Sequence, residues 1–187
     1  MSLMFLPIWR FITFLLAALT LAMAFCHLLE MSPKMKYDAA LYTTLQQTLY
    51  RNFGVPLGAA IETGAVIFTI VLAILNRKGG PVFYLTTITA SCDMAAFAIW
   101  FVRVAPANAE INKWTTTSVP ANWTQWRNQW ERAHAVRAVF FLLGFRLWFF
   151  LLSSDDRAKC GAFWLAPRQS NLLFGEHSSM VMAPYCR

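Results

Sequence analysis

Four long apolar stretches constrain this chain more than any other feature of its sequence. They run over residues 11–29, 55–75, 82–104 and 135–152. A helix needs roughly 20 mainly apolar residues to cross the hydrocarbon core of a bilayer, and each stretch reaches or approaches that length. The fourth is the shortest and contains Arg137 and Arg146. The pattern predicts an all-α integral membrane four-helix bundle over residues 1–152, followed by a tail of unknown role at 153–187.

The composition agrees with a membrane protein. Hydrophobic residues make up 58% of the chain and charged residues 13%, about half the charged fraction of an ordinary soluble domain. The net charge is +7, but the basic residues are scattered singly and form no patch for nucleic acid. The cysteines have no metal-site spacing and are expected to be free thiols: Cys26, Cys92, Cys160 and Cys186. We therefore expect a lipid bilayer, and no nucleic acid, as a partner.

The basic residues also indicate an orientation. Arg10, Arg77 and Lys78 lie in two short segments at one end, whereas the longer loops at the other end dilute their basic residues with acids. The positive-inside rule then places both termini in the cytoplasm, which we assign to a bacterial inner membrane. Residues 1–25 also have the pattern of a signal peptide, which we expect to be retained as the first helix.

The loop after the first stretch contains an amphipathic helix of its own, predicted over residues 37–53. Asp38 is a suitable N-cap, and Gly54 with Pro56 is expected to end the helix. Its apolar residues recur every four positions: Leu41, Leu45 and Leu49. We expect this helix to lie in the outer membrane interface, over the mouth of the bundle.

Two carboxylates fall inside the apolar stretches. An isolated carboxylate there costs about 2.5 to 3.5 kcal/mol, so Glu62 is expected to face the bundle interior and to have a partner. Gly64 would permit close helix approach nearby. Asp93 lies near the midplane, where it would serve a proton path or pair with Arg137 or Arg146.

The start of the fourth stretch carries a polar stripe. Glu131, His134 and Arg137 recur every three residues, so they lie on one helix face, and His27 and Glu30 share a face in the same way. In an antiparallel bundle, the ends of the first and third spans lie beside the starts of the second and fourth. One set of side chains is therefore predicted to converge at the outer end: His27, Glu30, Glu62, Glu131 and His134.

Two interpretations of this set remain open. Histidine and carboxylate sets bind Fe, Mn or Zn in bundle cores, so the five side chains are a candidate metal site, and a haem between His27 and His134 is a weaker hypothesis. Alternatively, no cofactor binds, the carboxylates near the interface are solvated, and the histidines form local hydrogen bonds. Buried ionisable residues in spans are functional by default, which favours a role for Glu62, His134 and Arg137.

Residues 9–152 resemble the anthrone-oxygenase-like family of small four-helix membrane proteins, many of which have no known function. Three signatures carry the resemblance: His27-Leu28-Leu29-Glu30, then Pro106-Ala107-Asn108 with Ile111 and Trp114, then Trp130 with His134-Ala135-Val136-Arg137. The resemblance implies an oxygenase that converts the methylene of an anthrone into a quinone carbonyl with O2. In that chemistry His134 would be the general base, and Arg137 or Asn108 would stabilise the developing phenolate.

The leading hypothesis is a small membrane oxidoreductase or oxygenase acting on a lipophilic, aromatic or quinone-like molecule that enters from the bilayer. Trp130, Trp114 and Tyr42 are its predicted substrate-binding residues. The alternative is an accessory or assembly subunit of a larger membrane complex, in which the 16 Phe and eight Trp make helix, lipid or pigment contacts. Besides the bilayer and a lipophilic small molecule, the expected partners are either such a complex or further copies of the chain in a homo-oligomer.

Overall fold

The computed structural model describes residues 4–51 and 53–165, and side chains up to residue 147 with the exception of 53–55. The chain divides into two units, residues 1–149 and 150–187. The candidate site lies entirely within the first unit, while the second contains the last part of the helix α6 (Trp123–Leu165). The described residues form helices and one isolated bridge, between Thr115 and Ser118, with no strand. The predicted all-α fold is therefore confirmed for this part of the chain.

Three helical segments of the described residues are long and apolar enough to cross a membrane: Phe5–Lys34, Pro56–Leu75 and Pro81–Ile111. The first is helix α1 (Phe5–Lys34), the second contains α3 (Ala59–Leu75), and the third begins with α4 (Pro81–Ile99). They confirm the spans expected over 11–29, 55–75 and 82–104. The expected fourth span, 135–152, lies on α6, and its side chains from 148 onward are outside the described part of the structure.

Helices α3 and α4 form the expected antiparallel hairpin. Asn76 ends α3, Gly80 has a φ of 54°, and Pro81 occupies the first turn of α4. A positive φ suits glycine, and proline costs nothing in a first turn because its missing N–H would have no intrahelical partner. Gly64 allows the expected close approach, because a Cβ added there would lie 3.4 Å from Leu16 on α1.

The amphipathic helix of the first loop begins as predicted. Asp38 caps α2 (Ala39–Leu45) by accepting a hydrogen bond of 2.8 Å from the Leu41 amide. The helix then continues as a π-helical segment, η1 (Gln46–Tyr50). Leu41 and Leu49 are about half exposed, and the face turned into the protein is instead formed by Tyr42 and Gln46. The leucine stripe is thus left to face outward.

The prediction that Gly54 and Pro56 end this helix is wrong. Both lie within a second π-helical segment, η2 (Phe53–Gly58), which leads directly into α3. Pro56 is tolerated there because the first amide groups of a helical segment have no intrahelical partners to lose.

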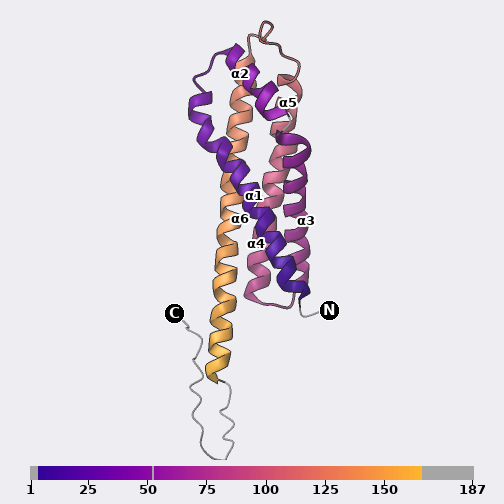
Figure 1. The fold of residues 1–187 in the computed structure, drawn as a ribbon, viewed down its shortest axis with the longest axis vertical. Coiled ribbons are helices and arrows are strands. Elements are labelled where there is room, and N and C mark those ends of the chain that lie inside the picture. The colour runs from indigo at the N-terminus through magenta and orange to yellow at the C-terminus, as the bar shows by residue number, and fades with distance from the viewer. Residues whose placement is uncertain (1–3, 52, 166–187) are drawn as a thin grey trace, which may run out of the picture. The chain divides into compact units, whose positions relative to one another are not determined.

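Helix α4 continues through a third π-helical segment, η3 (Trp100–Val104), into α5 (Ala105–Ile111). Pro106 falls in the first turn of α5, where it is again tolerated. Figure 1 shows α2 and α5 beside the first turns of α6, at one end of the first unit. The predicted convergence of the end of α1, the start of α3, the end of α4 and the start of α6 is confirmed by the side-chain contacts at this end.

Candidate functional site

The polar stripe at the start of α6 is buried along its whole length. Glu131, His134 and Arg137 are 1%, 7% and 4% exposed. Their spacing of three residues keeps them on one helix face, and that face is turned into the protein. Each of the three has a different set of partners, so the site divides into two parts. We call the part around Glu131, nearer the start of α6, the upper part, and the part around Arg137 the lower part.

Arg137 binds three groups on three elements. Its Nη2 atom lies 2.5 Å from Glu62 Oε2 on α3, its Nε atom donates to the Ala96 carbonyl of α4 at 3.1 Å, and its Nη1 atom lies 3.1 Å from His134 Nδ1. The expected partner of Glu62 is therefore Arg137. Only a guanidinium has several donors in a fixed planar arrangement, which lets one side chain join two helices to α6.

The contact with Arg137 determines which atom of His134 carries the proton. A guanidinium can only donate, so Nδ1 must accept, and in the neutral ring the hydrogen then resides on Nε2. His134 consequently presents a hydrogen-bond donor at Nε2. This geometry favours His134 as a stabiliser of negative charge over its predicted role as a general base.

Glu62 offers the acceptor that His134 does not. Its Oε2 atom is held by Arg137, whereas its Oε1 atom is buried and has no hydrogen-bond partner in the described part of the chain. A buried carboxylate oxygen without a partner is costly, so it marks a position where a ligand group or water can bind.

The two histidines of the sequence motifs meet. The rings of His27 and His134 have centroids 4.4 Å apart, and Trp130 lies against both, at 5.1 Å and 4.2 Å. Rings in such direct contact leave no room for a haem between them, so the geometry favours a cluster of tilted and edge-on rings over the haem hypothesis.

A buried lysine completes the upper part of the site. Lys34 is 2% exposed, and its Nζ atom lies 3.2 Å from Glu131 Oε2 and 3.6 Å from Glu30 Oε2. The ammonium also lies over the rings of Tyr50 and Trp130, at 4.9 Å and 4.7 Å from their centroids. Such cation–π contacts compensate part of the desolvation cost of a buried ammonium.

Two tyrosines connect this ion pair to the first loop. Tyr50 donates to Glu30, and Tyr42 donates to Glu131 Oε1 at 3.3 Å while accepting from Gln46 at 2.9 Å. Burial and the neighbouring carboxylates raise the pKa of both tyrosines well above the usual value, so both hydroxyls stay protonated. Burial also raises the pKa of Glu131, an effect that Lys34 opposes.

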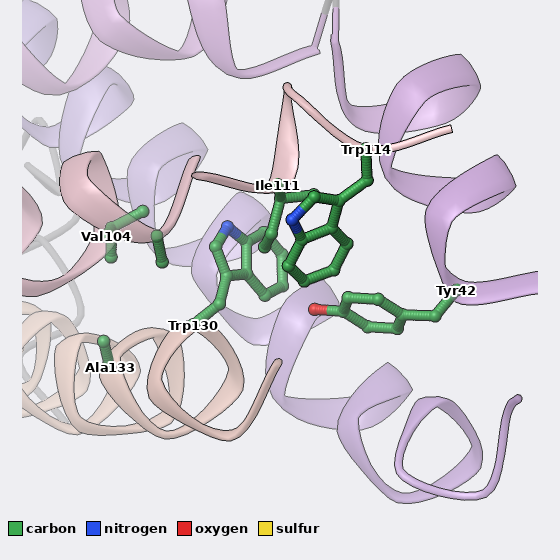
Figure 2. Close-up of a cluster of buried hydrophobic side chains, with 7 residues drawn as sticks. Tyr42, Val104, Ile111, Trp114, Trp130 and Ala133 are labelled. Atoms are coloured by element: carbon green, nitrogen blue, oxygen red, sulfur yellow. The ribbon is translucent and has the colours of Figure 1, made fainter. Parts of the chain in front are cut away.

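All three predicted substrate-binding residues, Tyr42, Trp114 and Trp130, belong to one buried apolar cluster. Figure 2 shows Trp114 and Ile111 packed between Trp130 and the ring of Tyr42, and Tyr42 and Trp114 are 0% and 4% exposed. Trp130 also donates from Nε1 to Asn108 Oδ1 at 2.7 Å. The cluster thus fixes the position of Trp130, and Tyr42 and Trp114 support the site from behind.

Two cavities adjoin the histidine pair. The first has a volume of about 370 Å³ and is lined by Glu62, Arg137 and apolar side chains such as Phe97 and Phe141. The second has a volume of about 380 Å³ and is lined by Trp130, Asn108 and other polar groups of η1 and α5. His27, Trp100 and His134 line both cavities, and both have the size of small-molecule sites.

Comparisons with known proteins found no matching family model, no matching curated protein and no matching solved structure.

The five predicted metal ligands come together only in part. His27 and His134 are in contact, but Glu62 pairs with Arg137, and Glu131 and Glu30 pair with Lys34. Among the described side chains, those of residues 4–51 and 56–147, there is no group of three or more His, Cys, Asp or Glu that could hold a metal ion. The geometry favours ion pairs over a metal site.

Asp93 is a further buried carboxylate, and one of its expected partners, Arg137, is instead bound to Glu62, Ala96 and His134. Asp93 is 5% exposed, bonds with Thr69 of α3, and lies next to Gly144 of α6. Its Oδ2 atom has no hydrogen-bond partner in the part of the chain described.

Cys26 and Cys92 are free thiols, as predicted.

Lys34 and Tyr50 are the residues that the sequence analysis missed as parts of the site. The spacing of four between Glu30 and Lys34 was a signal for an ion pair on α1. Ser32-Pro33, a pattern that usually ends a helix, hides this signal, but α1 continues to Lys34. Tyr50 gave no signal, because its position depends on the path of the first loop.

Proposed function

We propose that this protein is an integral membrane oxygenase, built as a four-helix bundle, that oxidises a lipophilic phenolic or quinone-like molecule in the first cavity. The observation that carries the proposal is the pair of groups that Arg137 holds at that cavity. Glu62 supplies an unpartnered acceptor oxygen, and His134 supplies an Nε2–H donor.

This arrangement fits the proton chemistry of an anthrone-type oxidation. Glu62 Oε1 accepts a proton from the activated methylene, while His134 Nε2–H donates to the oxygen on which negative charge develops. The carbanion reacts with O2 to form a C–O bond, and the peroxide anion takes the proton back from Glu62. The resulting hydroperoxide loses water as its O–O bond and the remaining C–H bond break. One methylene and one O2 thus give one carbonyl and one water, and no further reductant is needed.

The lining of the first cavity suits an apolar substrate from the bilayer. Met23, Phe97 and Phe141 line its wall, and Phe101 lines it while being 55% exposed on the outer surface of η3. A π-helical segment such as η3 is frequently found at functional sites, because it displaces side chains from the regular helical positions. The substrate would enter at this exposed aromatic side chain.

The test is whether the protein in lipid nanodiscs oxidises an anthrone. The reaction is measured by the uptake of O2 and by the absorbance of the quinone product. We expect Glu62→Gln to lower kcat by a factor of about 10² to 10⁴, the usual contribution of a general base. The amide can still accept from Arg137, so the fold is retained. Glu110→Gln, which removes a partly exposed carboxylate outside both cavities, is the control. Full activity in Glu62→Gln, or no oxidation by the unsubstituted protein, overturns the proposal.

A second function is favoured by one observation. The buried charges at Arg137 and Lys34 are paired with carboxylates on other helices, an arrangement that a purely structural subunit would also need. In an accessory subunit these pairs would only hold the helices together. Stoichiometric partners that copurify in mild detergent, together with absent oxidation, would support that function.

A further inference from the structure

The second cavity differs from the first in its chemistry. Its lining combines Trp100 and Trp130 with polar side chains of the first loop and α5: Gln46, Arg51, Asn108 and Asn112. None of its described lining residues is acidic. The cavity is therefore rich in hydrogen-bond donors and carries a positive charge.

Three of these side chains can donate to a ligand: Asn108, Arg51 and Asn112, which is exposed and lines the cavity. Asn108 uses its Oδ1 atom to accept from Trp130, which leaves its NH2 group to donate. Arg51 is exposed and lies at the end of η1, where its guanidinium can reach an anionic or carbonyl oxygen. An oxygen-rich group would be bound here more tightly than an apolar one.

The two cavities share His27, Trp100 and His134, so a ligand that passes these side chains can occupy both. We infer that the protein binds one amphiphilic molecule, with its apolar ring system in the first cavity and an oxygen-rich, anionic head in the second. The inference rests on the proposed function for the class of ring system, but its test measures binding and not oxidation.

The probes are two unreactive ligands that differ only in the head, anthraquinone and anthraquinone-2-carboxylate. Their binding to the protein in nanodiscs is followed by quenching of tryptophan fluorescence, with empty nanodiscs subtracted. We expect the carboxylate to bind at least about fivefold more tightly, the equivalent of one net hydrogen bond. Equal affinities, or no binding of either ligand, would overturn the inference.

Substitutions in each cavity separate the two halves of the site. Asn112→Leu and Arg51→Gln should weaken only the carboxylate, by about three- to tenfold each, because they remove donors from the second cavity. Arg132→Gln is the control, since Arg132 is exposed and lines neither cavity. An equal effect of Asn112→Leu and Arg51→Gln on both ligands would contradict the inference.

The first cavity is tested by filling it. Ala59→Phe places a ring among its lining residues and should weaken both ligands about tenfold or more, whereas Ala60→Phe, on the exposed neighbour outside the cavity, should change neither. If the carboxylate preference is found without oxidation of anthrones, the binding inference stands and the oxygenase proposal fails. If oxidation occurs without the preference, the reverse holds.

Discussion

Arg137 is the side chain on which the lower part of the site depends. It holds Glu62, His134 and the Ala96 carbonyl at once from three separate nitrogen atoms, whereas the three donors of a lysine all lie on one nitrogen and cannot reach acceptors spread over this distance. We expect Arg137→Lys to lower the free energy of unfolding by about 2 to 3 kcal/mol, the value of one or two hydrogen bonds to charged groups. Unfolding in mixed micelles measures this change.

The matched control is Arg132→Lys on the exposed face of the same helix, for which a change within about 0.5 kcal/mol is expected. A double-mutant cycle of Glu62→Gln and Arg137→Gln should show a coupling free energy above about 1 kcal/mol, as for residues in direct contact. Additive effects in this cycle would mean that the two side chains do not pair.

Lys34 joins the last turn of α1 to the first turns of α6. Lys34→Met keeps the side-chain volume but leaves Glu131 buried without its cation, which should cost about 3 to 5 kcal/mol at neutral pH. Lys36→Met, on an exposed lysine two residues later, should cost almost nothing. The double variant Lys34→Met with Glu131→Gln should recover most of the loss, and a failure to recover would refute the ion pair.

The loss in free energy of unfolding caused by Lys34→Met should also depend on pH, and it should become smaller as the pH falls. Burial raises the pKa of Glu131 and Lys34 opposes this, so removing Lys34 raises that pKa further. A folded state that binds the proton more tightly than the unfolded state gains stability as the pH falls towards about 4.3, the ordinary pKa of glutamate. The difference between Lys34→Met and the unsubstituted protein should therefore shrink on acidification, and a constant difference would argue against Glu131 as the cause.

The long helices could be predicted from the sequence, whereas their connections could not. Runs of about 20 apolar residues have few alternatives to a helix in a membrane, and the Asp38 cap depends only on local chemistry. The prolines were harder, because Pro33 lies inside the last turn of α1, Pro56 lies within η2 and Pro106 lies in the first turn of α5, so none of the three ends a helix at its own position. The π-helical segments left no recognisable pattern in the sequence.

The meeting of side chains at the site could be predicted only in outline. Antiparallel order brought His27, Glu62 and His134 to one end, and the contacts agree with that prediction. The choice of partners depends on which helices are neighbours and how they are rotated, so the sequence suggested a metal for carboxylates that in fact bind Arg137 and Lys34.

The distribution of basic residues predicts the orientation of the whole molecule in the membrane. One segment that is long and apolar enough to cross a membrane, Pro81–Ile111, separates the loop at Lys78 from the loop at Lys113, so we expect these two positions to face opposite sides. Arg77 and Lys78 lie in the short loop that the positive-inside rule assigns to the cytoplasm. In a variant with all cysteines replaced by serine, Lys113→Cys should react with an impermeant maleimide in intact cells. Lys78→Cys should react only after lysis, and labelling of both positions from outside would reject this topology.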